Sequence, residues 1–162
     1  MKDAQERATE AMMAVSRTMT AVVARTLTEV SEEVTVPQLR VLVLLSSRGP
    51  MNLKTVAEHL AVNPSNASRT CDRLVASGKV ARRGDAGDRR NVNLSITEDG
   101  ADFVERLMES RRRLLDRVVA RMDHTDQAAL AQALEAFSRA VAAAPPEETV
   151  GLPDGRIIPW LL

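Results

Sequence analysis

The chain has 162 residues, enough for one domain with a hydrophobic core. Hydrophobic residues make up 44% and charged residues 27%, as in ordinary globular proteins, but aromatic residues make up only 2%, so the core must be aliphatic. The single cysteine, Cys71, excludes an internal disulfide. No apolar run approaches the ~20 residues of a membrane span, and the charged residues 1–10 lack a signal-peptide hydrophobic region. These features predict a cytoplasmic protein without a membrane partner.

The charge of the chain is balanced overall but uneven along its length. Basic and acidic residues number 22 each, so the formal net charge is zero. Residues 63–97 nevertheless hold seven basic and three acidic residues, a net charge of +4, and the rest of the chain carries −4. Such a distribution favours contact with a polyanion through one face of the molecule.

The N-terminal part predicts two helices. Apolar residues recur every three or four positions over residues 4–30, which indicates a long amphipathic helix. Residues 31–34 break this pattern. Residues 35–38, with the sequence Thr-Val-Pro-Gln, are typical of a capping box with Pro in the first turn. They open a second helix that is closed at Gly49.

Two short helices follow, separated by a short turn. Asn52 can cap a helix over residues 53–60. The Asn-Pro pair at residues 63–64 then supplies the N-cap and the first residue of a fourth helix. This helix should run to about residue 77 and end at Gly78, a typical C-cap residue.

After the fourth helix the hydrophobic period changes from about 3.6 to 2. Val92, Leu94 and Ile96 alternate with polar residues, which predicts a half-buried strand. Residues 80–83 are its expected partner, and the polar, Gly-rich residues 84–89 form the hairpin loop between them.

Two further helices and an apolar tail complete the chain. Thr97 is expected to cap a fifth helix that continues to about Met122, and Thr125 to cap a sixth helix that ends near residue 144. Residues 145–162 begin with two prolines and end in an apolar segment. An exposed apolar segment is rare in soluble proteins, so we expect this tail to dock on the outer helices.

The second, third and fourth helices of the chain, followed by the hairpin, have the order of a winged helix-turn-helix. The fourth helix of the chain is then the recognition helix. Short polar residues near its N-terminus suit the floor of the major groove, and Arg can pair with guanine. The inward face should hold Ala67, Cys71, Leu74 and Val75. The outward, DNA-contacting face should hold Ser65, Asn66, Ser68, Arg69 and Arg73.

The hairpin is the predicted wing. Arg82 and Arg83 on its first strand can reach phosphates. At the far end of its loop, Asp88, Arg89 and Arg90 place arginines where a narrow minor groove would attract them. Asp88 is then expected to orient Arg90.

Residues 53–100 resemble the MarR family of transcriptional regulators. The resemblance rests on Asp-Arg-Leu at 72–74, Val-Ala-Arg at 80–82, Asp-Arg-Arg at 88–90 and Leu-Ser-Ile-Thr at 94–97, in that order and spacing. It implies a mainly α fold with a small β-wing (α+β), with N- and C-terminal dimerisation helices. It also implies a homodimer, a pseudo-palindromic operator in double-stranded DNA and, as in many members, a small-molecule or oxidant inducer bound where the lobes meet.

The resulting domain prediction has four parts. Residues 1–34 form an N-terminal dimerisation helix and residues 35–100 the winged helix-turn-helix. Residues 101–144 form the C-terminal dimerisation helices, and residues 145–162 an apolar tail docked on the dimerisation lobe. The predicted function is that of a nucleoid-associated, sequence-specific DNA-binding regulator, most simply a repressor.

Other functions fit the residues less well. A winged-helix module that binds protein, or shapes DNA without an inducer, remains the alternative. No nucleophile, base and orienting group can be assembled into an enzyme site, and neither a metal nor another cofactor is expected, because His59 and His124 lie far apart in the sequence. Cys71 should be a buried apolar residue rather than a redox sensor, and residues 111–113, three consecutive arginines, a solvated stripe.

Overall fold

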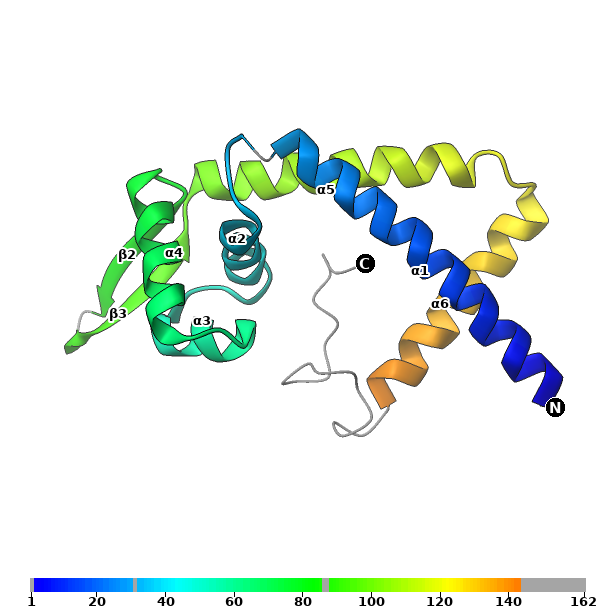
Figure 1. The fold of residues 1–162 in the computed structure, drawn as a ribbon, viewed down its shortest axis with the longest axis horizontal. Coiled ribbons are helices and arrows are strands. Elements are labelled where there is room, and N and C mark those ends of the chain that lie inside the picture. The colour runs from blue at the N-terminus through cyan, green and yellow to red at the C-terminus, as the bar shows by residue number, and fades with distance from the viewer. Residues whose placement is uncertain (1, 31, 86–87, 144–162) are drawn as a thin grey trace.

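A computed structural model describes residues 2–30, 32–85 and 88–143, with all side chains in these ranges except those of Lys2, Val30, Asp85 and residues 88–91. The winged helix lies at one end of an elongated molecule, and long helices extend from it to the other end (Figure 1). The elements are α1 (Lys2–Val30), α2 (Val36–Arg48), β1 (Met51–Asn52), α3 (Leu53–Leu60), α4 (Pro64–Ala76), β2 (Val80–Asp85), β3 (Asp88–Ile96), α5 (Glu98–Val119) and α6 (His124–Ala143).

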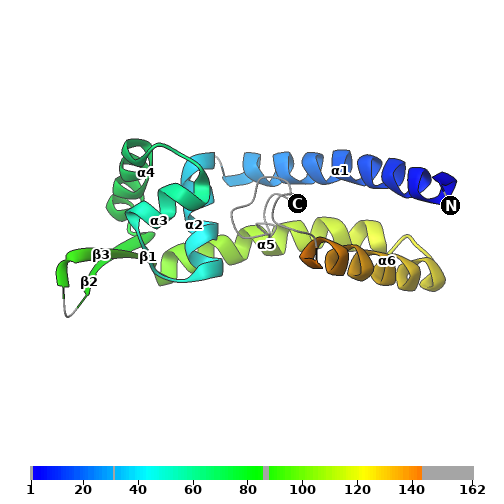
Figure 2. The same ribbon diagram turned by 90° about the horizontal axis from the view of Figure 1, so that it is seen from below.

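The predicted fold class is confirmed: the chain is mainly α, with one small antiparallel sheet in the order β1-β3-β2. Strand β1 was not predicted, because two residues are too short to show a period. It pairs Met51 with Leu94 and so attaches the wing to the start of α3. Figure 2 shows α1 and α5 both extending away from the winged helix, and Figure 1 shows that they approach each other near the C-terminal end of α1 and diverge beyond it, with α6 turning back at an angle from the end of α5. None of the described helices is both long and apolar enough to cross a membrane.

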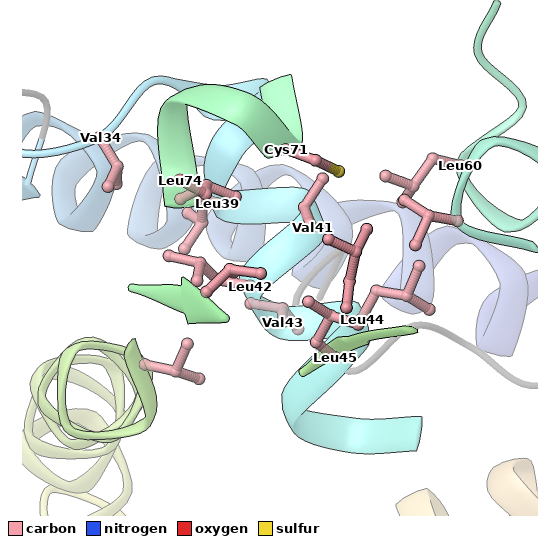
Figure 3. Close-up of a cluster of buried hydrophobic side chains, with 14 of the residues drawn as sticks. Val34, Leu39, Val41, Leu42, Val43, Leu44, Leu45, Leu60, Cys71 and Leu74 are labelled. Carbon is pink, nitrogen blue, oxygen red and sulfur yellow. The ribbon is translucent and has the colours of Figure 1, made fainter. Parts of the chain in front are cut away.

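Helix α2 forms the centre of the core. Its residues Leu39 and 41–45 are buried, so almost the whole circumference of the helix is covered by its neighbours. Figure 3 shows these side chains meeting Leu60 of α3 and Cys71 and Leu74 of α4. Phe103 of α5 is the one aromatic side chain in this cluster, which is otherwise aliphatic as the composition predicts.

Most of the predicted helix starts are confirmed by hydrogen bonds. Gln38 Oε1 accepts the backbone N–H of Thr35 at 2.7 Å, and Asn52 Oδ1 accepts that of Thr55 at 2.9 Å. Thr97 Oγ1 accepts the N–H of Gly100 at 3.1 Å. These short polar side chains act through local sequence alone, which is why the sequence revealed them.

The cap predicted for the sixth helix is wrong. Helix α6 begins at His124, and Asp123 Oδ1 accepts the N–H of Asp126 at 2.8 Å. Asp and Thr are both favourable N-caps, so composition could not separate Asp123 from Thr125.

The predicted hairpin loop is too long. Strand β2 continues to Asp85 and β3 begins at Asp88, with a register irregularity between Gly84 and Asp85. Gly84, Asp85, Asp88 and Arg89 therefore belong to strands, since their ladder continues beyond the alternating apolar residues. The predicted docked tail, residues 145–162, lies outside the described residues.

Arg111 is buried rather than solvated, with only 6% of its surface exposed. Its Nε donates a hydrogen bond to Oγ1 of the buried Thr26 on α1, at 3.2 Å. Burial lowers the pKa of the Arg111 guanidinium from its usual value. Arg111 follows Phe103 and Leu107 at four-residue steps and so lies on the buried stripe of α5, whereas the two arginines that come after it are exposed. The helical spacing could have separated Arg111 from its neighbours, but only the packing of α1 on α5 supplies its partner.

The wing and α5 are joined by close backbone contact. Thr97 donates from its backbone N–H to Lys79 O at 3.1 Å, and from its hydroxyl to Gly78 O at 2.7 Å. A Cβ atom on Gly100 would lie 2.2 Å from Lys79 O, a backbone atom that cannot simply swing away. Glycine is therefore required here for close approach of the helix to the strand.

We expect Gly100→Ala to lower the free energy of unfolding by about 1–3 kcal/mol, because α5 must move away from β2 to make room for the methyl group. Urea unfolding followed by circular dichroism measures this change. Gly84→Ala is the matched control, since a Cβ there meets nothing within 4 Å. Equal stabilities of the Gly100 variant and the unchanged protein would contradict the predicted close approach.

Candidate nucleic-acid interface

Helix α4 has one buried face, as predicted for a recognition helix. Asn63 Oδ1 accepts the N–H of Ser65 at 2.9 Å and caps the helix, with Pro64 in its first turn. Ala67, Cys71 and Leu74 are buried, and Val75 is half-buried against the core. The helix is thus fixed by one stripe and leaves the opposite stripe to solvent.

The opposite stripe gathers most of the predicted DNA-contacting residues. Ser65, Asn66, Arg69 and Arg73 are exposed, whereas Ser68 is half-buried and its hydroxyl lies 3.4 Å from Asp72 Oδ2. The guanidinium of Arg69 donates to Asn66 Oδ1 at 3.0 Å and to Ser65 O at 3.4 Å. Three predicted site residues are therefore in mutual contact at the N-terminal end of the helix.

The angle between α3 and α2 is held by a residue that sequence reasoning missed. Arg40 of α2 donates from Nη2 to Leu60 O, the last residue of α3, at 3.1 Å. A carbonyl at a helix C-terminus lacks an intrahelical partner, and a cation there is favourable. Arg40 lies within the predicted second helix and belongs to no recognisable motif, so nothing in the sequence singled it out.

In the wing, Arg82 and Arg83 lie on opposite faces of β2, because successive side chains of a strand alternate. Arg82 is paired in register with the buried Leu94, so it lies on the face that meets the core and α4. Its Nη2 forms an ion pair with Asp72 Oδ1 on the recognition helix. The sequence predicted neither this pairing nor any role for Asp72.

The predicted wing-tip residues are described only in part. Asp88, Arg89 and Arg90 lie at the start of β3, but their side chains are outside the described residues. Their contact with DNA, and the orientation of Arg90 by Asp88, stay predictions.

A second ion-pair cluster links the base of the wing to the long helices. Lys79 is 8% exposed, and its Nζ lies 2.9 Å from Asp99 Oδ2 of α5 and 3.8 Å from Glu33 Oε2. The same ammonium lies 5.1 Å from the centre of the Phe103 ring, a cation–π distance. Arg106 of α5 also reaches Glu33, at 3.9 Å. The connection between α1 and α2 is thereby tied to the wing and to α5.

Cys71 is buried in the core and its thiol is protonated near neutral pH. Burial raises the pKa of the thiol to about 11, with Asp72 raising it further and Arg82 lowering it. The thiolate is the reactive form, so this environment suits an inert apolar side chain. Among the described residues, no group of His, Cys, Asp or Glu is arranged to hold a metal ion.

The fold and the exposed stripe of α4 define a winged helix-turn-helix, DNA-binding protein. A model of the MarR family matches residues 34–92. Over 109 residues, 67% of this chain and 68% of the relative, the chain is 30% identical to the HTH-type transcriptional regulator YfiV of Bacillus subtilis. Over 87 residues it is 32% identical to the HTH-type transcriptional repressor MdtR of the same organism, covering 54% of this chain and 56% of MdtR.

Solved structures also resemble this chain in fold. RV1404 from Mycobacterium tuberculosis is 38% identical with a TM-score of 0.73, covering 82% of this chain and 90% of that one. A MarR family protein from Bacillus stearothermophilus shares the fold at 18% identity, with a TM-score of 0.72, covering 86% of this chain and 96% of that one. The chain belongs to the MarR family and is a DNA-binding transcriptional regulator, in a family of regulators rather than enzymes.

We expect Cys71 to resist alkylation by iodoacetamide at pH 8 in the folded protein and to react quickly in denaturant. The pKa of about 11 lies above the ordinary 9.0, so the folded state keeps the proton more tightly than the unfolded state. The resulting stabilisation is complete below about pH 9 and is lost as the pH rises towards 11. Mass spectrometry measures the labelling. Rapid modification of the folded protein at pH 8 would contradict this assignment.

Proposed function

We propose that this protein is a transcriptional repressor that binds a pseudo-palindromic operator as a homodimer and is released by a small molecule. The observation that carries the DNA-binding part is the placement of Arg69 and Arg73 on the solvent side of α4, opposite Ala67, Cys71 and Leu74. A helix held in this way can enter a major groove without losing its core contacts. The name of the relative MdtR, a transcriptional repressor, supports repression.

The base-reading residues are those of the exposed stripe. Arg pairs bidentately with guanine, and the neighbouring Ser and Asn side chains are short enough to let the helix approach the base edges. Arg83, exposed on the outer face of β2, is suited to a phosphate. The proposed set is Ser65, Asn66, Ser68, Arg69 and Arg73 in the major groove, Arg83 at the backbone, and Asp88, Arg89 and Arg90 at the minor groove.

The homodimer is supported by apolar side chains on the outer helices. Helix α6 has no buried residue, and its Leu134 and Phe137 are 43% and 42% exposed. On α1, Met13 is 53% exposed, and on α5, Val118 is 55% exposed. Large apolar side chains left exposed on each of the outer helices favour an interface there. A second copy presents the same helices, so a two-fold axis would bring matching apolar faces together.

The inducer is supported by a cavity of about 230 Å³ between the end of α1 and the middle of α5. Glu33 and Arg106 line this cavity and also belong to the cluster around Lys79 at the base of the wing. A ligand that binds one of these charged groups would compete with the ion pairs that connect α1 and α5 to the wing. Ligand binding there would therefore be coupled to the position of the DNA-binding elements.

Selection of duplexes from random DNA by the wild-type protein should return inverted half-sites about 10 base pairs apart, centre to centre. Arg69→Ala should lower affinity by about 1–3 kcal/mol and relax preference at one position in each half-site. Fluorescence anisotropy on the selected duplex and its single-base variants measures both effects. The affinity of the wild-type protein should fall steeply with salt, because phosphate contacts release counterions.

Retained preference at every position in the Arg69 variant would contradict the role proposed for α4. A selected site without inverted symmetry would contradict dimeric operator binding. Ligand screening against the protein–duplex complex separates an inducible repressor from a DNA-shaping module without an inducer, since only the repressor is released by a ligand.

We expect Phe137→Glu to weaken the dimer. Burying one Phe contributes about 1.5–3 kcal/mol, and the substitution acts in both copies, so the dissociation constant should rise at least about 100-fold. Sedimentation velocity over a concentration series measures this change. Gln132→Glu, on the opposite side of α6, introduces the same charge and should leave the dimer intact. Equal behaviour of the two variants would place the interface elsewhere.

A further inference from the structure

Asp72 is an acidic side chain in the DNA-facing part of the molecule, and simple electrostatics gives it no reason to be there. It lies on α4 directly after the buried Cys71 and directly before the exposed Arg73. A carboxylate close to DNA repels phosphates and so weakens binding.

The structure gives both carboxylate oxygens of Asp72 a partner. Oδ1 is paired with Arg82 Nη2 on the wing strand, and Oδ2 lies 3.4 Å from the hydroxyl of Ser68, one turn earlier on α4. The Asp72 carboxylate therefore lies between Ser68 of its own helix and Arg82 of the wing strand, with one oxygen turned to each.

Arg82 is directed towards α4 by the pleat of the wing. It shares a face of β2 with the buried Val80 and is opposite the buried Leu94 of β3. Arg83, on the other face, is exposed and turned away from α4. The two neighbouring arginines therefore have different surroundings, although the sequence suggests the same role for both.

The ion pair is too exposed to be explained by stability. The side chains of Arg82 and Asp72 are 47% and 50% exposed. Pairs in such contact with water are screened and contribute little to the free energy of unfolding. What the pair does supply is a direct side-chain link between the recognition helix and the wing, the two elements that must contact one duplex together.

We propose that Asp72 is a positioning residue, which holds the wing at a fixed angle to the recognition helix through Arg82. Arg82 then acts through Asp72 and makes no phosphate contact of its own. This inference deepens the proposed function and rests on it. The link is absent from any single segment of the sequence, since its partners are ten positions apart on a helix and a strand.

The first test needs no DNA. Hydrogen exchange of the β2 and β3 amides is compared in the wild-type protein, Asp72→Ala, Arg82→Ala and the control Arg83→Ala. Loss of the link should raise exchange across the wing by about two- to fivefold in both the Asp72 and Arg82 variants, as expected for a half-exposed ion pair, and not in the Arg83 control. Unchanged exchange in the Asp72 variant would overturn the proposal.

The second test uses the duplex selected by the wild-type protein, with anisotropy titrations over a salt series. Asp72→Ala and Arg82→Ala should each weaken DNA binding at least about fivefold. The double variant should bind no more weakly than the single variant with the lower affinity, because both substitutions break the same link. Their slopes of log affinity against log salt should equal that of the wild type. Arg83→Ala should lower the slope by about one per protomer.

Two results would overturn the proposal here. Tighter binding by Asp72→Ala would mean that the carboxylate only repels DNA. A lower salt slope in Arg82→Ala, like that of Arg83→Ala, would make Arg82 a phosphate contact. If the wild-type protein selects no duplex, the proposed function fails, and the exchange measurement alone decides whether Asp72 holds the wing.

Discussion

The burial of α2 is the constraint on which the DNA-binding half of the molecule depends. Residues 41–45 of this helix are buried in succession, so α3, α4, α5 and β3 must surround it. Exposure of such an aliphatic helix to water is unfavourable. Burying it contributes about 25 cal/mol to the free energy of folding for each Å² of apolar area. The exposed stripe of α4 exists because its other stripe, Ala67, Cys71 and Leu74, is used to cover α2.

Around this core, polar contacts fix the relative orientations of helices and strands that apolar packing alone does not define. Arg40 fixes the end of α3, and Thr97 fixes the base of the wing to the start of α5. Lys79, at the base of the wing, forms ion pairs with Asp99 of α5 and with Glu33. Each contact joins segments distant in the sequence. Hydrogen bonds and ion pairs demand definite geometry, so they orient elements that hydrophobic contact only brings together.

The outer half of the molecule is organised differently. Helix α1 contacts α5 near its C-terminal end, where Thr26 is buried, but Met13 and Val15 nearer its start are exposed. Helix α6 has no buried residue. A single chain thus completes the core of the winged helix and leaves the apolar faces of the outer helices uncovered. The proposed dimer would supply the missing cover with the same side chains from a second copy.

The sequence by itself determined the six helices, the two wing strands and their order, because these follow from local chemistry. Asn52, Asn63 and Thr97 cap helices through neighbouring backbone groups, and the change of period at Val92 marks the strand. The buried and exposed stripes of α4 follow from helical spacing. Only the tertiary structure decided that Arg82 meets Asp72, that Arg111 is buried against Thr26, and that β1 exists at all. Each of these depends on which segments pack together. The apolar pattern of one segment does not indicate which polar side chain of another segment will contact it.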